Sequence, residues 1–331
     1  MQRLPYAGTP TEPVRPGLFD PKADVKTDFQ LEELQLQSGG TLTPRVSYYI
    51  HHHLVEDGSP GTLYTGWIRF NNLLASNWLN LTVGQIEVPL TFSPEIERLS
   101  AFDYLAFGRE IGANPFDFNT PQLGIQLYGQ SEKGTKLWAG VVNGFGLALN
   151  DQTGKNDNNS FKDLYLRVTQ EIGEHYVGGF VYYGRARGST DQTPDFKDNF
   201  VRTGGDAFIN LGRFVTYGSL VYGHDQDPLG IGESRNFVGG FVEGDLYFSD
   251  RGAFLLRFDA VHQKLPALFP PTTAAGASDP EQPGPLVRVN TRAFTPGILY
   301  LVRPNVRLGF EYQVRQSRTE DRAIVELHLS F

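Results

Sequence analysis

The sequence contains no cysteine, only one methionine and no long apolar run. The absence of cysteine excludes disulfides, thiolate metal sites and a cysteine nucleophile. No stretch approaches the roughly 18 consecutive apolar residues that a transmembrane helix needs. Lysine is scarce as well: 8 of the 29 basic residues are lysines. The basic residues are therefore mostly arginines, which suit binding sites with several planar donors.

Charge and motifs exclude two further classes of function. The net charge is −8, whereas a protein that binds nucleic acid carries a basic surface, so no nucleic-acid partner is expected. The sequence contains no GxSxG, Walker loop, HExxH or GxGxxG motif, so no enzyme is predicted. A hydrolase site assembled from separate strands stays open, because residue spacing cannot reveal it.

Apolar and polar residues alternate with a period of two near the end of the chain. The apolar members of this pattern are Val306, Leu308, Phe310, Tyr312 and Val314, followed by Ala323, Val325, Leu327, Leu329 and Phe331. A strand places alternate residues on one face, whereas a helix would scatter them around its circumference. Both segments are therefore predicted to be strands.

Similar segments recur throughout the chain and define fifteen expected strands. They cover 27–38, 42–54, 62–74, 77–90, 121–129, 135–147, 161–171, 175–186, 199–211, 213–224, 236–248, 252–262, 286–302, 305–317 and 323–331. Helical periodicity is hard to find anywhere in the sequence. The predicted fold class is all-β.

Strand length distinguishes a soluble sandwich from a membrane barrel. Sandwich strands run to about 5–6 residues, whereas strands that cross a bilayer at a tilt need about 9–11. Short turns also alternate here with long polar loops at 145–160, 187–198, 224–235 and 264–285, as in outer-membrane barrels. We therefore expect a transmembrane antiparallel β-barrel.

The number of strands follows from parity. A closed antiparallel barrel needs an even number of strands, so a sixteenth is expected between residues 12 and 25. Fourteen strands is the alternative count. The domain organisation is then a Pro-rich segment at 1–25, including a first strand, and a barrel at 26–331.

The two strand faces should carry different residues. An arginine that faces lipid near mid-membrane costs about 2–4 kcal/mol, so strand arginines are expected to face the lumen. Aromatic residues make up 13% of the chain and fit girdles at the two membrane interfaces; their alternative is packing in a soluble core. The expected girdle residues are Tyr48, Trp67, Trp78, Trp138, Tyr182, Tyr222, Tyr247 and Phe248.

Several short segments resemble known outer-membrane sequences. The ending Ala323-x-Val325-x-Leu327-x-Leu329-x-Phe331 resembles the C-terminal assembly signal of outer-membrane proteins. The segment 83–90 (VGQIEVPL) resembles the GQxxxPF element of the phosphate-selective porin family of the O and P type, with Leu90 in place of Phe. The segments 109–112 (REIG), 123–129 and 138–144 are similar to its next elements, so the resemblance covers about residues 28–170.

The resemblance implies a sixteen-stranded and usually trimeric outer-membrane channel with an inward-folded loop. The lysine cluster of the phosphate-binding members cannot be placed on this sequence, and many members are general porins. The signal peptide of an exported protein is expected to have been removed already from this numbering.

The segment 91–119 is too long for an ordinary hairpin loop, and such loops are usually functional. Its charged residues are Glu95, Glu97, Arg98, Asp103, Arg109, Glu110 and Asp117, and its aromatic residues are Phe92, Phe102, Tyr104, Phe107, Phe116 and Phe118. We expect this segment to fold into the lumen and set the constriction. An external loop or a trimer-contact loop is the alternative.

A basic wall is expected opposite this loop. Its members are Arg257, Arg288, Arg292, Arg307 and Arg315, and the predicted pore lining also includes Arg45, Arg109, Glu110, Glu95, Glu97, Asp259 and Glu311. Charges along the lumen wall determine the selectivity of a pore, so the wall favours anions. Neutralisation of Arg257 by Asp259, and of Arg307 by Glu311, is the alternative.

No cofactor or metal site is predicted. His51 and His53 share a strand face and His52 lies on the other, which makes a poor chelate without a third ligand, and the oxygen-rich run 150–159 is expected to be solvated. The predicted function is a porin in the outer membrane of a Gram-negative bacterium that lets small hydrophilic solutes or ions diffuse passively, with a preference for anions. The expected partners are outer-membrane lipid, two further copies in a homotrimer, and small anionic or polar solutes. Segment 1–25 is expected to be a flexible or loosely docked tail, and a plug or an element that binds an envelope partner is the alternative. The alternative is a structural barrel that anchors a larger envelope complex.

Overall fold

The computed structural model describes residues 33–56, 59–75, 78–90, 98–144, 159–188, 195–266, 286–316 and 321–329. The Pro-rich segment 1–25, Glu95, Glu97, most of the run 150–159 and Phe331 lie outside these residues, as does the side chain of Arg288. The strand expected between residues 12 and 25, and the domain boundary at 25, also lie outside them and stay predictions.

The described chain forms one antiparallel sheet of sixteen strands. The first eight are β1 (Glu33–Thr43), β2 (Val46–Glu56), β3 (Ser59–Pro60), β4 (Leu63–Phe70), β5 (Asn80–Ile86), β6 (Gln122–Gln130), β7 (Thr135–Val142) and β8 (Asp163–Ile172). The others are β9 (His175–Gly188), β10 (Phe196–Asn210), β11 (Phe214–Asp225), β12 (Arg235–Ser249), β13 (Gly252–Pro266), β14 (Leu286–Arg303), β15 (Val306–Arg315) and β16 (Arg322–Leu329). A single 3-10 turn, η1 (Leu73–Ala75), is the one helical element among the described residues.

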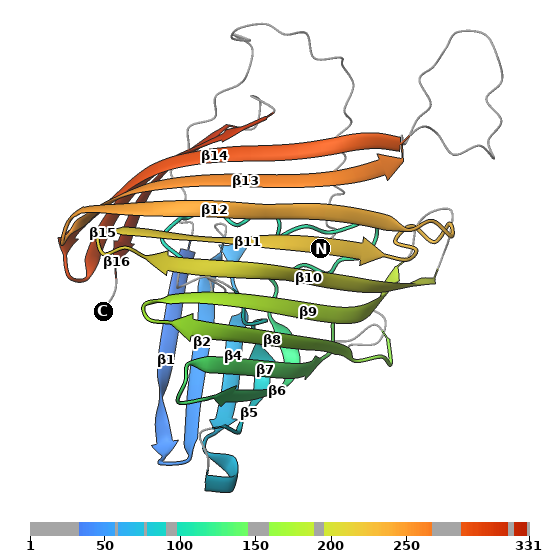
Figure 1. The fold of residues 1–331 in the computed structure, drawn as a ribbon, viewed down its shortest axis with the longest axis horizontal. Coiled ribbons are helices and arrows are strands. Elements are labelled where there is room, and N and C mark those ends of the chain that lie inside the picture. The colour runs from blue at the N-terminus through green and yellow to red at the C-terminus, as the bar shows by residue number, and fades with distance from the viewer. Residues whose placement is uncertain are drawn as a thin grey trace, which may run out of the picture. The chain divides into compact units, whose positions relative to one another are not determined.

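Each strand pairs with its neighbours along the chain, and only the two-residue β3 lies off this path, beside β2 (Figure 1). The fifteen longer strands overlap the fifteen predicted segments one by one, so the all-β prediction is confirmed. Between the described residues of β1 and β16 there is no ladder. No helix in the described part of the chain is long and apolar enough to cross a membrane.

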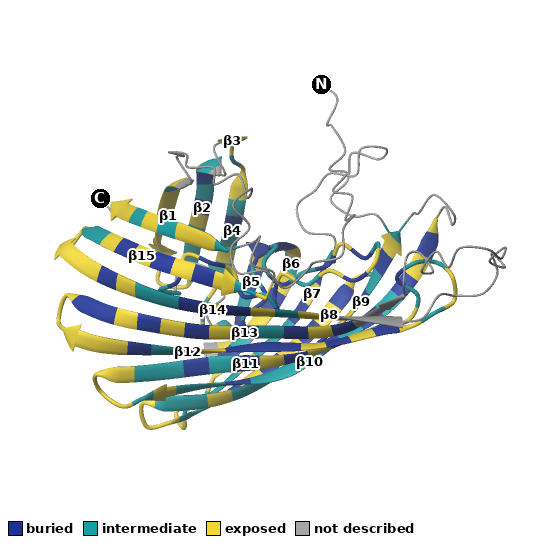
Figure 2. Ribbon diagram, turned by 90° about the horizontal axis from the view of Figure 1, so that it is seen from above, coloured by how far each residue is buried: buried dark blue, intermediate teal, exposed yellow. Residues whose placement is uncertain are grey.

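The ladders fix which residues share a face of the sheet. Between β13 and β14, Arg257 lies opposite Thr295 and Phe258 lies opposite Phe294. Arg257 and Thr295 are fully buried, whereas both phenylalanines are about half exposed. We call the side of Arg257 the inner face and that of Phe258 the outer face. Figure 2 shows this alternation of buried and exposed residues along the strands.

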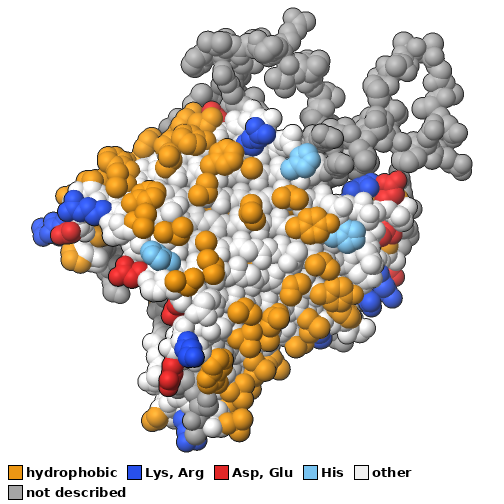
Figure 3. Space-filling model, in the orientation of Figure 1, with side chains coloured by type: hydrophobic (Ala, Val, Ile, Leu, Met, Phe, Trp, Pro, Cys, Tyr) orange, Lys and Arg blue, Asp and Glu red, His pale blue; other side chains and the backbone are white. Residues whose placement is uncertain are grey.

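The outer face is apolar over the middle of the strands. Its exposed residues include Leu123, Ile125, Val141, Leu164, Val181, Leu220, Val242, Leu256, Phe310, Leu327 and Leu329. Figure 3 shows hydrophobic side chains spread over the strands on the visible face, with most charged side chains near its borders. An apolar band with polar margins is the surface that a transmembrane barrel presents to lipid.

Short turns join the strands at one end of the sheet. Gly173 and Gly212 lie in two of these turns with φ of 65° and 77°, a left-handed conformation that glycine adopts at little cost. Most connections at the other end are longer, and the β5–β6 connection is the longest with described residues. The core of the protein lies where this connection packs against the inner face.

Candidate pore constriction

The β5–β6 connection folds back onto the inner face of the sheet. We call residues 98–121 of this connection the inner loop. The Ser100 hydroxyl donates to Glu311 Oε2 over 2.7 Å, and the Ala101 backbone N–H donates to Glu311 Oε1 over 2.7 Å. Glu311 lies on β15, nine strands along the sheet path from β6. The predicted inward folding of this loop is confirmed.

Arg257 on β13 joins the inner loop to the sheet. Its Nη1 donates to Ser100 Oγ over 2.9 Å and to the Phe102 carbonyl over 2.7 Å, while Nε donates to Asp259 Oδ2 over 2.8 Å. Asp259 in turn accepts the backbone N–H of Leu105 over 3.2 Å. Arg257 and Asp259 are both fully buried, and a buried charge is tolerated when its hydrogen-bond partners are present. These two residues therefore hold the first half of the inner loop.

Asn114 holds the second half. Its amide nitrogen donates to Asp198 Oδ2 over 3.1 Å and to Asp225 Oδ2 over 2.9 Å. Asp225 also accepts two bonds from the Arg202 guanidinium, of which Nη2–Oδ2 measures 3.1 Å. The neighbouring Ala113 N–H donates to the Pro228 carbonyl over 2.8 Å, so this end of the loop is tied to β10, β11 and the connection after β11.

Aromatic side chains fill the space between the loop and the sheet. Tyr104 stacks on Phe241 with ring centroids 3.7 Å apart, and Phe116 packs on Phe200 at 4.8 Å. Phe118 meets Phe180 edge to face at 5.6 Å. Such pairs contribute about 0.5–1.5 kcal/mol each beyond their buried area. The loop is therefore a packed layer on the inner face.

The side of the inner loop that does not pack against the sheet carries acidic residues. Asp103 and Glu110 are exposed, and Asp117 is partly buried. Burial and the neighbouring Asp117 raise the pKa of Glu110 above its usual value. Burial also raises the pKa of Asp117, to which Asp103 adds. Arg98 forms an ion pair with Asp103 at 2.6 Å and offsets part of this negative charge.

A cavity of about 520 Å³ opens on the inner face between β2 and β10, near the short turns. We call it the vestibule. Its described lining is Tyr49, Trp67, Arg69, Thr82, Ile86, Glu87, Pro89, Leu90, Gln126, Lys136, Trp138, Arg167, Thr169, Glu171, Tyr176 and Phe208. Two of its cations are ion-paired: Arg167 with Asp206 at 2.6 Å and Lys136 with Glu171 at 2.6 Å. In the described structure Arg69 has no carboxylate partner; its Nε donates to Thr82 Oγ1 over 3.0 Å.

The structure brings only some of the predicted pore residues together. Arg109, Arg257, Asp259 and Glu311 meet at the inner loop, where Arg109 Nε donates to Gln263 Oε1 over 2.8 Å. Glu110 lies on the free side of the same loop. Arg257, Asp259 and Glu311 are buried and bond to the inner loop or to each other. This burial favours an anchoring role over contact with passing solutes.

The remaining predicted arginines lie apart from that cluster. Arg307 and Arg315 lie on the inner face of β15, where Arg307 pairs with Glu326 at 2.8 Å and Arg315 donates to Gln313 over 2.7 Å. Arg307 therefore pairs with Glu326, not with Glu311 as the alternative had it. The expectation that Arg292 faces the lumen is wrong, because it is exposed and lies opposite Ala260 on the outer face. Arg45 lies in the β1–β2 turn, not on a strand.

Three expected girdle aromatics also lie on the inner face. Tyr182 is fully buried there beside Phe116, and Trp67 and Trp138 line the vestibule. The sequence contains a signal that could have placed Trp67 correctly. Residues two apart on a strand share a face, so Trp67 lies on the same face as Arg69, and an arginine is expected to face the lumen. Arg69, Arg167, Arg202 and Arg235 lie on the inner face and were missed by sequence reasoning.

His51 and His53 lie side by side on the inner face, with ring centroids 4.7 Å apart, and His53 stacks on Tyr64 at 4.7 Å. The described residues contain no group of three His, Asp or Glu side chains placed to hold a metal ion.

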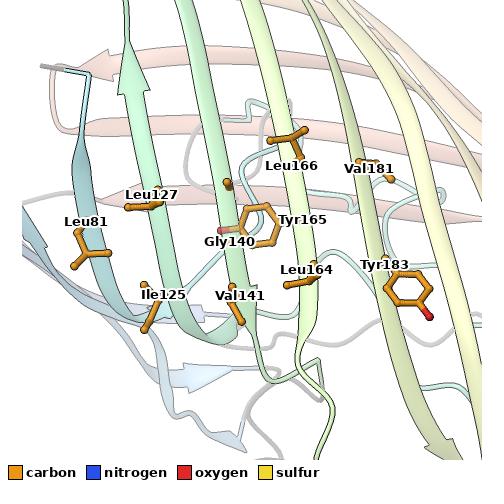
Figure 4. Close-up of a pocket in the computed structure, with 11 residues that line it drawn as sticks. Leu81, Ile125, Leu127, Gly140, Val141, Leu164, Tyr165, Leu166, Val181 and Tyr183 are labelled. Carbon is orange, nitrogen blue, oxygen red and sulfur yellow. The ribbon is translucent and has the colours of Figure 1, made fainter.

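A second hollow, of about 530 Å³, lies on the outer face. Figure 4 shows its leucine and valine side chains on β5 to β9, with the Tyr165 ring beside Gly140, which has no side chain to fill the space. The described lining contains no charged side chain. This hollow belongs to the apolar surface and is separate from the vestibule.

Comparison with known proteins supports the architecture. No protein-family model matches the sequence, and no curated protein matches it. Among solved structures, the anion-selective porin from Comamonas acidovorans has a TM-score of 0.57 at 10% identity, over 85% of this chain and 77% of that one. OmpF of Salmonella typhi, in complex with daunomycin, has a TM-score of 0.54 at 10% identity, over 90% and 89%. The trimer form of the outer-membrane protein OmpT from Vibrio cholerae has a TM-score of 0.50 at 11% identity, over 89% and 86%.

The chain has the fold of an outer-membrane porin. The sixteen antiparallel strands, the apolar outer face and the loop folded onto the inner face all belong to this transmembrane β-barrel.

Proposed function

We propose that the protein is a channel, rather than an enzyme, through which small hydrophilic solutes diffuse passively across the outer membrane of a Gram-negative bacterium. The observation that carries this proposal is the inner loop, which reaches Glu311 and Arg257 from the β5–β6 connection. A loop held inside a barrel narrows the lumen and leaves a path whose width and charge select solutes.

We further propose a preference for anions, set mainly by Arg69. Arg69 faces the vestibule without a carboxylate partner among the described residues, whereas Arg167 and Lys136 are neutralised by ion pairs. The acidic side of the loop opposes this preference, but Arg98 offsets Asp103. Charges within about 8–10 Å of the solute path act on selectivity at physiological salt, so the balance of these few groups decides it.

Arg307, Arg315 and Arg109, together with Glu110, remain proposed pore-lining residues, and Arg257, Asp259 and Glu311 are proposed to position the loop. Glu95 and Glu97 are proposed to contribute as well, on sequence grounds alone. Arg288 is not, because its position on β14, opposite Lys264, is in register with the outward Arg292. A distant relationship to the phosphate-selective porins of the O and P type is proposed from segment 83–90 and the elements that follow it.

A homotrimer in contact with outer-membrane lipid is the proposed assembly, supported by the trimer form of the similar Vibrio cholerae protein. The Pro-rich segment 1–25 is proposed as a docking element for an envelope partner.

Planar-bilayer recording with the purified full-length chain tests the function. A passive channel gives stepwise, ohmic current increments and a reversal potential under a KCl gradient that indicates anion preference. A heat-modifiable, folded barrel that inserts but gives no steps would instead support the anchor alternative. Swelling of liposomes in sugars of increasing size then measures the width of the constriction.

A further inference from the structure

The vestibule places one unpaired cation among aromatic rings. The guanidinium carbon of Arg69 lies over the Trp67 ring at 4.6 Å from its centroid and over the Tyr128 ring at 5.6 Å. Cation–π contacts of this kind hold a guanidinium in a fixed orientation. Thr82 binds Nε, so the two terminal nitrogens Nη1 and Nη2 have no hydrogen-bond partner among the described residues.

A guanidinium whose two terminal nitrogens are unoccupied matches a carboxylate, because two parallel N–H bonds reach its two oxygens. One uncompensated positive charge suits one negative charge. A multiply charged anion such as phosphate would also approach the carboxylates of Glu87 and Glu171, which line the same cavity.

The remainder of the lining is suited to a flat apolar group. Trp67 and Trp138 lie on β4 and β7, and Tyr128 on β6 lies between them, 5.2 Å from Trp138 by ring centroids. Ile86, Leu90 and Phe208 line other parts of the cavity. The volume of about 520 Å³ falls in the range of roughly 300–1,000 Å³ that is typical of small-molecule sites.

We propose that the vestibule is a binding subsite for small aromatic monocarboxylates, with Arg69 binding the carboxylate and the aromatic and apolar lining, including Trp138, contacting the ring. This proposal rests on the proposed channel function, for which it names a class of solute. The subsite would raise the local concentration of such anions inside the lumen.

Tryptophan fluorescence provides the direct test. The chain has three tryptophans, of which Trp67 and Trp138 line the vestibule and Trp78 is half exposed elsewhere. The purified full-length protein in vesicles is titrated with 4-nitrobenzoate, a quenching aromatic carboxylate, and with 4-nitrobenzyl alcohol, its neutral counterpart. We expect saturable quenching by the acid at concentrations at least tenfold lower than by the alcohol.

Variants test whether Arg69 is responsible for binding the acid. Arg69→Gln should weaken binding of the acid at least tenfold and leave binding of the alcohol unchanged. Arg69→Lys should give an intermediate result, because lysine keeps the positive charge but lacks the two parallel N–H donors of the guanidinium. Arg213→Gln, in an exposed turn, and Trp78→Phe should both quench like the wild type. Heat modifiability on gels verifies that each variant is folded.

Three results would overturn the proposal: equal affinity for acid and alcohol, an unaltered titration in folded Arg69→Gln, or displacement by inorganic phosphate as efficient as by benzoate. These results would leave the channel function intact if the protein still gives conductance steps. Absence of steps would refute the channel alone, because quenching does not require transport.

Discussion

Removing the Glu311 carboxylate should loosen the inner loop. Glu311 is nearly fully buried and accepts hydrogen bonds from the Ser100 hydroxyl and the Ala101 N–H, both over 2.7 Å. Hydrogen bonds to a charged group contribute about 1.5–3 kcal/mol each. The substitution Glu311→Ala therefore removes about 3 kcal/mol or more from the docking of this end of the loop.

A loss of about 3 kcal/mol raises the ratio of undocked to docked loop by roughly 100-fold. Single-channel recording should detect this change as more frequent transitions to a higher conductance level, since an undocked loop obstructs less of the lumen. The matched control is Gln313→Ala, two residues along the same face of β15. Gln313 is equally buried but bonds Thr295 and Arg315, with no bond to the described residues of the inner loop.

The reasoning fails if folded Glu311→Ala shows the same conductance levels and transition frequency as both wild type and Gln313→Ala. The loop would then be held by other contacts or would lie outside the path of the ions.

Three further predictions concern lipid contact, pH and packing. Phe310→Arg should lower the folding yield in vesicles, since an arginine in the hydrocarbon costs about 2–4 kcal/mol, whereas Phe310→Leu should fold normally; equal yields would refute the outer-face assignment. The pKa values of Glu110 and Asp117 are raised, so as the pH falls from neutral they should gain protons at a higher pH than ordinary carboxyl groups, which removes negative charge and shifts the reversal potential toward anions. The double variant with Gln and Asn at these positions should lose that shift, and an unchanged shift would contradict the assignment. Gly140→Ala should lower thermal stability by about 1–3 kcal/mol, because its Cβ would overlap the Tyr165 ring; Tyr165→Leu in the same chain should restore stability, and no rescue would show another cause.

Period-two alternation was sufficient to predict the strands and the outer face. Phe310 and Leu327, for example, are exposed on the outer face as expected. Alternation is a local property that persists because lipid and lumen differ sharply in polarity. The inward loop could also be predicted, since its length and aromatic content suit neither a turn nor a solvated segment.

The predictions of face that proved wrong concern residue types that can lie on either face of the sheet. Aromatic side chains suit a membrane interface and also a lumen wall, so Trp67 and Trp138 could not be placed by type alone. Arg292 was placed wrongly because β14 has 18 residues, more than the roughly 9–11 that cross a bilayer. Its outward arginine lies toward the long-loop end, where lipid-facing charge costs only about 0–1 kcal/mol.

The anchoring contacts required the structure. Arg257 and Ser100 are separated by 157 positions in the sequence, and no local pattern indicates which buried cation meets which loop. Arg257, which was expected to belong to a basic wall along the pore, is instead buried and connects the inner loop to the sheet.

Charge introduced on the free side of the inner loop tests most directly whether that loop lies in the conduction path. The natural chain has no cysteine, so Glu110→Cys provides one reactive thiol on an exposed loop position. A positively charged methanethiosulfonate reagent added during single-channel recording should produce stepwise drops in conductance and a shift in reversal potential, with wild type unaffected. Complete labelling, verified by mass spectrometry, without any change in current would contradict the account.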